Sequence, residues 1–305
     1  MSSTAIAASL EQPYRRTVRP NFFGTMRGEL FKVSRMWSTW ITLVMLLGAI
    51  CLPYLVSLGA PNLKDNLSKT PLIFYYDVME LNLSVLRIFI GFFLLILTAN
   101  VFGREYSLGT IRILLARGVG RLQLLGAKLL AVVLIALVVF LIGLLLNVLL
   151  SGLLLIVLAG NFDSLKVLDS AFGSNTWLYL ISILVSMGVT ILMAMAVTVV
   201  GRSLSFGLSA ALAWFPADNL GVYFLFLGYR LTKAPFWNDI TAYLLGPNLN
   251  LMPSVLIPAK FKAESLGITP MVKVDSTHTL LVALVYALVF AAVAVVLTWK
   301  RDVKE

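Results

Sequence analysis

The sequence contains only one cysteine, Cys51, and one histidine, His278, among its 305 residues. A single thiol cannot form a disulfide within the chain. One histidine and one cysteine cannot supply the four ligands of a structural zinc site. We therefore expect no metal site. Cys51 is interpreted as a small apolar filler within a hydrophobic run, and His278 as a solvated residue beside an external helix start.

A phosphate-binding loop of the form G-x4-G-K-[S/T] is also missing. The nearest stretch, Gly126-Ala127-Lys128, lacks the adjacent Gly and Lys that the loop needs to cradle nucleotide phosphates. No grouping of nucleophile, base and acid stands out elsewhere. The sequence therefore predicts no catalytic residue and no cofactor of its own, so that any energy for work comes from another protein.

Charge is scarce as well. Charged residues make up 12% of the chain and hydrophobic residues 60%, and the mean hydropathy is +0.94. A soluble domain needs a more polar surface, so the composition predicts an integral membrane protein. The net charge of +10 is interpreted as a set of topology signals and lipid-headgroup contacts, and not as a nucleic-acid surface.

The apolar runs predict an all-α polytopic protein with six membrane-spanning helices. These are residues 37–58, 83–102, 122–150, 177–200, 204–227 and 280–299. The third run stays apolar to residue 160, which predicts one long helix that projects from the membrane or breaks near Ser151 and Gly152. An even number of spans places both termini on the same side.

Two further segments flank these spans. Residues 1–20 are predicted to form a disordered, basic tail that lacks the apolar region of a signal peptide. Residues 21–305 are predicted to form a single transmembrane domain, which begins with an interfacial amphipathic helix over 21–36. The proline-rich segment 228–277 cannot be one helix. It predicts an external segment with short helices near 240–245 and 255–263 that dip into the outer leaflet.

The connection between the second and third spans, residues 101–128, concentrates charge between two apolar runs. Its ionisable residues are Arg104, Glu105, Arg112, Arg117, Arg121 and Lys128. Short loops rich in Lys and Arg stay in the cytoplasm, so this connection is expected to face the cytoplasm. With six spans, both termini then lie there too.

A helix is predicted over about residues 104–118, because the spacing of apolar residues has a helical period. One face would carry Tyr106, Ile111, Leu114 and Leu115. The basic residues would lie elsewhere: Arg104, Arg112 and Arg117. Gly118 and Gly120 would end the helix. The residues alone leave two interpretations open, a part that another protein pushes on or a solvated connector that anchors to headgroups.

The connection resembles the E-x3-G-T-x3-L-L-x5-R-x6-K pattern that follows the second span in permease subunits of ABC-2 type transporters. The residues that carry the resemblance are Glu105, Gly109, Thr110, Leu114, Leu115, Arg121 and Lys128. The small residue or proline usual before the arginine is here Gly120. The resemblance extends over about residues 22–303 and includes the aromatic-basic-Asp ending at 299–302.

The resemblance implies a coupling helix that seats in a cleft of a separate cytoplasmic ABC ATPase subunit, which would hold ATP and Mg²⁺. The implied contact residues are Arg104, Glu105, Tyr106, Gly109, Thr110, Arg112, Leu114, Leu115, Arg117, Gly118 and Arg121. It also implies export by alternating access, a second permease copy or paralogue as partner, surrounding membrane lipids, and the plasma membrane of a bacterium or archaeon. Glu105 has two interpretations, a buried acid and a carboxylate paired with Arg104, Arg112 or a basic group of the partner, and the second is expected.

Three polar residues fall inside predicted spans, namely Arg87, Asn147 and Asp218. A charge or an amide in hydrocarbon needs a partner or access to the interface. Arg87 and Asp218 are interpreted as snorkelling, as pairing with each other, or as lining the exit of a substrate route. Asn147 is interpreted as a helix-packing residue or as part of a polar wall along that route.

Two other functions fit the same sequence. A membrane scaffold that anchors an ATPase or an envelope complex would share the topology and the charged connection. An ion-coupled secondary transporter would need acids near the bilayer midplane, for which Asp218 is the one candidate. The substrate class is not encoded in any motif, so drugs, peptides, lipids, polysaccharides and ions all fit.

Overall fold

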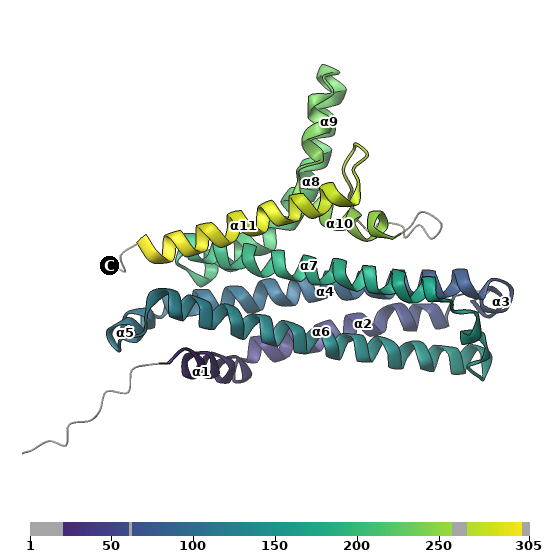
Figure 1. Cartoon of the computed structure of the whole chain (residues 1–305), viewed down its shortest axis with the longest axis horizontal. Helices are drawn as coiled ribbons and strands as arrows, with labels where there is room; N and C mark the ends of the chain where they lie inside the picture. The colour runs from purple at the N-terminus through teal and green to yellow at the C-terminus, as the bar shows by residue number, and fades with distance from the viewer. Residues whose placement is uncertain (1–20, 61–62, 258–266, 301–305) are drawn as a thin grey trace, which may run out of the picture.

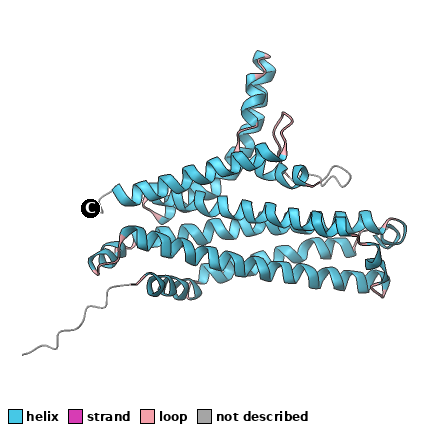
Figure 2. Cartoon of the chain, in the orientation of Figure 1, coloured by secondary structure: helices cyan, strands magenta, loops and turns pink. Residues whose placement is uncertain are grey.

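The structure, a computed structural model, describes residues 21–60, 63–257 and 267–300. Within this part of the chain every regular element is a helix (Figure 2), which confirms the predicted all-α class. The elements are α1 (Phe22–Ser34), α2 (Trp37–Leu58), α3 (Leu63–Lys69), α4 (Pro71–Ser107), α5 (Thr110–Ala116), α6 (Arg121–Ala159), η1 (Asp163–Val167), α7 (Ser170–Gly201), α8 (Leu204–Thr232), α9 (Phe236–Thr241), α10 (Leu245–Leu256) and α11 (Ser276–Lys300).

Six of the described helices are long and apolar enough to cross a membrane, namely α2, α4, α6, α7, α8 and α11. The predicted number of spans is therefore confirmed. The core lies mainly between α4 and α7, which pack along each other. Leu86, Ile90 and Leu94 on α4 and Ile183 on α7 are fully buried there. These two helices form the centre of the bundle, and the other spans surround them.

The short helices mark the two ends of the bundle. α1, α5 and the end of α11 lie at one end, called here the α5 end, and α3 lies at the opposite end, the α3 end (Figure 1). The chain thus enters and leaves the described bundle at the same end. This arrangement agrees with the even number of spans.

Several helices are longer than the sequence predicted. α4 begins at Pro71 and not near residue 83, since proline fits the first turn of a helix and the polar side chains at this end need not lie in lipid. Of the two alternatives for the third span, the single long helix is observed and the break near Ser151 is not, because α6 continues from Arg121 to Ala159. At 1.5 Å per residue, its 39 residues extend about 58 Å, so α6 projects well beyond a hydrocarbon core of about 30 Å.

The segment after the fifth span also differs from its prediction. α8 continues to Thr232, and the described short helices are α9 and α10 in place of the predicted 240–245. Of the predicted helix over 255–263, residues 255–256 form the end of α10. Pro247 falls in the first turn of α10 and Pro253 within it, positions that the proline count alone did not indicate. α9 stands apart from the bundle, whereas α10 packs against α11 (Figure 1). The predictions for residues 1–20, 258–263 and 301–305 lie outside the described residues.

Near the α5 end, α4 and α8 approach so closely that a side chain has no room. A Cβ added to Gly103 on α4 would lie 2.7 Å from the Cα atom of Leu204 at the start of α8. Leu204 also donates its backbone N–H to the Ser107 hydroxyl, at 2.9 Å. The last turns of α4 are therefore fixed in position by backbone packing just before α5 begins.

Candidate functional site

α5 is a separate, seven-residue helix between two glycine turns. Gly109 precedes it with φ +68° and Gly118 follows it with φ +85°. Left-handed backbone at these two positions favours glycine. The predicted helix over 104–118 is therefore divided, because Arg104 to Ser107 belong to α4 and the chain turns sharply at Gly109.

The side chains of α5 are only partly covered. None of its residues is buried, and it packs chiefly against α4. The predicted apolar face is half-buried: Tyr106, Ile111, Leu114 and Leu115. Two other apolar residues point outward, with Ile113 54% and Leu108 65% exposed. α5 thus presents an apolar surface that the described part of the chain leaves uncovered.

Cavities lie on both sides of α5. One, of roughly 330 Å³, is lined by Ile111, Arg112 and Leu115 together with residues of α6, α7 and α11. The other, of roughly 590 Å³, is lined by Ile113 and Leu114 together with α1 and the end of α4. These cavities leave α5 loosely packed on two sides.

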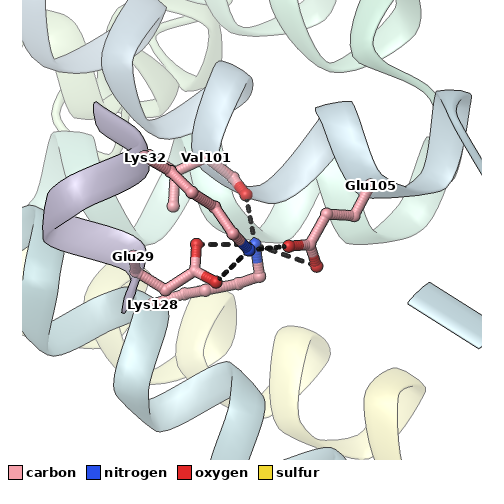
Figure 3. A network of polar contacts seen from close by, with 5 residues as sticks. All are labelled: Glu29, Lys32, Val101, Glu105 and Lys128. Carbon is pink, nitrogen blue, oxygen red and sulfur yellow. Dashed lines mark hydrogen bonds and ion pairs between the residues drawn. The ribbon is translucent and has the colours of Figure 1, made fainter. Parts of the chain in front are cut away.

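At the base of α5, four charged side chains form an ionic ring, defined here as Glu29, Lys32, Glu105 and Lys128 (Figure 3). Lys128 Nζ lies 3.3 Å from Glu29 Oε2 and 3.2 Å from Glu105 Oε2. Lys32 Nζ lies 2.6 Å from Glu29 Oε1 and 2.6 Å from Glu105 Oε1. Each lysine therefore bridges the same two carboxylates, and the ring has no net charge.

The ring is buried except at Lys32. Glu29, Glu105 and Lys128 are 4%, 7% and 3% exposed. Lys128 also donates to the Val101 carbonyl oxygen, at 2.5 Å. Burial alone would lower the pKa of Lys32, but its hydrogen bonds to Glu105 and Glu29 outweigh this and raise the pKa above its ordinary value. Lys32 is therefore held as a cation.

The ring joins three helices that are far apart in the sequence. Glu29 and Lys32 come from α1, Glu105 from α4 and Lys128 from α6. α1 also packs along α6. The ring therefore fixes the interfacial helix to the last turn of α4, one turn before α5.

This arrangement corrects the expected role of Glu105. The carboxylate pairs with Lys32 and Lys128 inside the protein, and not with Arg104 or Arg112. Glu29, Lys32 and Lys128 were not among the predicted site residues, although Lys128 belongs to the family pattern. A signal was present, because a lysine within a long apolar run needs a carboxylate partner, but the sequence did not say which carboxylate.

The remaining residues of the predicted contact lie around α5. Arg104, Gly109, Arg112, Arg117 and Gly118 are exposed, and Thr110 is half-buried. Arg121 at the start of α6 donates to the Trp299 carbonyl oxygen of α11, at 3.3 Å. The structure thus brings this set together at one end of the bundle. Its contact with an ATPase stays a prediction.

Asn147 lies in a contact between α2 and α6. The Tyr54 hydroxyl donates to the Asn147 side-chain and backbone oxygens, both at 3.0 Å, and lies 2.9 Å from the Ser151 hydroxyl. The Asn147 amide nitrogen donates to the Gly143 carbonyl oxygen at 2.9 Å. These bonds satisfy the buried amide and favour the helix-packing interpretation.

Arg87 and Asp218 both contact α10. Arg87 donates through Nη1 to the Leu249 carbonyl oxygen, and its Nη2 lies 3.5 Å from Asn250 Oδ1. Asp218 accepts from the Gly246 backbone N–H. The described contacts connect the two charges to α10, and a pair between them is not among those contacts. α10 therefore contacts both charged side chains.

Comparison with known proteins adds one finding. The family model described as "ABC-2 family transporter protein" matches residues 25–215, well over half of the chain. No match was found among curated proteins or among solved structures. The matched region covers α5, the ionic ring and five of the six candidate spans, with α8 matched in part. The chain therefore belongs to the ABC-2 transporter family, as a multi-pass membrane protein of the permease type.

Proposed function

We propose that this chain is the permease subunit of an ATP-driven exporter and that α5 is the coupling helix on which a separate cytoplasmic ABC ATPase acts. The observation that carries the proposal is that the residues of α5 are exposed or half-buried, while the end of α4 directly before it is held by the ionic ring. Leu108 and Ile113 face outward, and Glu105 is fixed to two other helices a few residues away. A force applied to α5 would therefore move α4, α1 and α6 together.

The charge around α5 supports its orientation. Arg104, Arg112 and Arg117 are exposed beside it, and short basic connections stay in the cytoplasm. With this orientation the α5 end faces the cytoplasm, where ATP is available. The chain would then span the plasma membrane of a bacterium or archaeon with both termini inside.

Energy would come from the partner. ATP and Mg²⁺ would bind to the ATPase subunit, and closure of two such subunits would push on two α5 helices. A second permease copy or a paralogue would supply the other α5, as ABC-2 family membership implies. The substrate would then leave through a route formed by the spans.

The experiment distinguishes loss of the contact between α5 and the ATPase from misfolding of the permease. The tagged full chain is purified with its ATPase, and MgATP hydrolysis by the complex is measured. Ile113→Asp combined with Arg117→Glu is expected to weaken retention of the ATPase roughly thirtyfold or more, since central residues of an interface each contribute about 2 kcal/mol or more. Ile113 of α5 and Arg117 directly after it are both exposed, so the fold is expected to persist.

The matched control is Leu165→Asp. Leu165 is a half-exposed leucine of η1, in the connection between α6 and α7, far in sequence from α5. The control is expected to retain the ATPase. Equal retention by the α5 variant and the control would refute the coupling role. Retention of an ATPase by a complex that moves no solute into inverted vesicles would instead support the scaffold.

A further inference from the structure

The larger cavity at the α5 end, of roughly 590 Å³, lies between α1, the end of α4 and α5. All four residues of the ionic ring line it. Each lysine of the ring lies between the same two carboxylates, so the charges of the ring cancel (Figure 3). The net charge of the cavity is therefore set by the other ionisable residues that line it.

These other residues are three arginines. Arg35 ends α1, Arg104 lies in the last turns of α4, and Arg117 follows α5. All three are exposed. Among the described residues, no acid forms an ion pair with any of them, and the ring supplies the only acids that line the cavity. The cavity thus has three positive charges, from three elements, that the described chain does not neutralise.

Arg35 is positioned by the corner between α1 and α2. Its backbone N–H donates to the Lys32 carbonyl oxygen at 3.1 Å, and its Cζ atom lies 5.2 Å from the centre of the Phe31 ring. The corner itself is fixed by Trp40, whose Nε1 donates to the Ser34 carbonyl oxygen at 2.9 Å. Within the described part of the chain, the Arg35 guanidinium accepts no hydrogen-bond partner. Its N–H groups are therefore available to an anion.

Exposed aromatic residues beside the cavity indicate its depth in the membrane. Phe31 lines the cavity and is 63% exposed, and Trp37 and Trp40 at the start of α2 are 82% and 53% exposed. Tryptophan is enriched at the membrane–water interface, where its apolar ring and its polar N–H are both accommodated. Since the candidate span α2 begins at Trp37, the cavity lies at the depth of the lipid headgroups.

The rest of the lining is mainly apolar. It includes Val33, Met36, Val101, Leu108, Ile113 and Leu114. Arginine donates charge-assisted hydrogen bonds to phosphate oxygens, and apolar side chains suit the hydrocarbon attached to a headgroup. The volume lies within the range of ligand pockets, about 300–1,000 Å³. Charge, depth and lining therefore all suit an anionic lipid.

We propose that this cavity binds the phosphate headgroup of an anionic phospholipid from the leaflet at the α5 end. Basic pockets between helices are known to bind such headgroups. One lipid bound to Arg35, Arg104 and Arg117 would connect α1, α4 and α5. Binding requires only that the α5 end lies at a membrane surface. Stronger coupling to the ATPase in anionic membranes would be a consequence, and it rests on the proposed function.

The test measures which headgroup enters the cavity. The full chain is reconstituted without ATPase or ATP in phosphatidylcholine nanodiscs that contain a trace of phosphatidylglycerol with a diazirine close to its glycerol. Phosphatidylcholine with the same labelled chain is the reference probe. Phosphatidylglycerol is expected to label peptides of α1, the end of α4 and α5 about tenfold more strongly than the reference, equivalent to about 1.4 kcal/mol.

Arg35 is the residue to change, because it lies outside the predicted ATPase contact. Arg35→Gln is expected to reduce the preference for phosphatidylglycerol about fivefold, since each arginine near an anionic headgroup contributes about 1 kcal/mol. Arg35→Lys keeps the charge and should keep most of the preference. Arg27→Gln is the matched control, because Arg27 is another exposed arginine of α1 that does not line the cavity.

Inorganic phosphate in millimolar excess is expected to leave the labelling unchanged, because it lacks the hydrocarbon. Displacement of the probe by inorganic phosphate would identify a site for the free anion and overturn the lipid assignment. Equal labelling by the two lipids would also overturn it and would favour an acidic segment of the ATPase as the partner of the arginines. An unchanged preference in Arg35→Gln, or equal losses in Arg35→Gln and Arg27→Gln, would exclude a defined site.

These measurements contain no ATPase, so their failure leaves retention of the ATPase by α5 to its own test. Loss of the coupling role would likewise leave the lipid labelling unchanged.

Discussion

Charge is buried in two regions of this protein, and the two regions treat it differently. At the α5 end, two lysines and two glutamates neutralise each other in the ionic ring. In the region around α10, Arg87 donates to the Leu249 carbonyl oxygen, and Asp218 accepts from the Gly246 backbone N–H. The ionic ring therefore joins three helices through opposite charges, whereas Arg87 of α4 and Asp218 of α8 each bond to one short helix.

The packing of α4 differs in the same way between the two regions. Gly103, near the ring, has another backbone against it, and Gly91, beside a cavity that Arg87 also lines, faces open space. One helix therefore has a tightly packed part near α5 and a more loosely packed part farther from α5. The comparison predicts that substitutions of similar chemistry will have unequal effects in the two regions.

The largest effect is expected from Lys128→Met. Without the Lys128 ammonium, the buried carboxylates of Glu29 and Glu105 keep only the half-exposed Lys32 in the ring. An uncompensated buried charge lowers the free energy of unfolding by about 3–5 kcal/mol. We expect a loss of unfolding free energy of about 3 kcal/mol or more, measured by denaturant titration in detergent. Lys69→Met is the control, since its pair with Asp65 is mostly exposed and contributes about 0–1 kcal/mol. Similar losses of unfolding free energy in Lys128→Met and Lys69→Met would show that the ionic ring does not stabilise the protein.

The next effect is expected from alanine at the two glycines of α4. Gly103→Ala forces the backbones of α4 and α8 apart and should destabilise the protein by about 1–3 kcal/mol. Gly91→Ala meets no atom and should be neutral or stabilising by up to about 1 kcal/mol, because alanine favours the helix. Thermal unfolding of the two variants, compared in one detergent, measures the difference. Equal unfolding temperatures would contradict the packing contrast.

A smaller effect is expected from Tyr54→Phe. The buried hydroxyl bonds Asn147 and Ser151 between α2 and α6, and a hydrogen bond of this kind contributes about 1 kcal/mol. Denaturant titration should show this loss while vesicle transport is unchanged. Tyr223→Phe, at an exposed tyrosine, should change neither. Transport lost at unchanged stability would place Asn147 on a substrate route instead.

The smallest effect is expected from Lys32→Met, because Lys32 is half-exposed and such pairs contribute less than about 1 kcal/mol. Its pKa is raised in the folded protein, so folding favours the protonated form. The contribution is present below the unfolded pKa and is lost as the pH rises through the raised folded value. The stability difference between variant and parent should therefore be constant near neutral pH and shrink in strong alkali.

The sequence predicted the spans better than it predicted the site. Runs of apolar residues identify spanning helices because hydrocarbon excludes unsatisfied backbone and charge. Helix ends were less predictable, since α4 and α8 continue past the point where polar residues begin. The connection around α5 was recognised as a helix, but its division at Gly109 depends on a left-handed backbone that glycine permits without requiring.

Composition and periodicity alone determined that this chain is an all-α membrane protein with six spans and a charged connection after the second. Lipid excludes charged residues, so the composition of each segment alone indicates whether that segment spans the membrane. Only the tertiary structure decided that Glu105 meets Lys32 and Lys128, and that Arg87 meets α10 beside a cavity. Which buried charges become neighbours depends on how separate helices pack, because a single sequence specifies the need for a partner and not its identity.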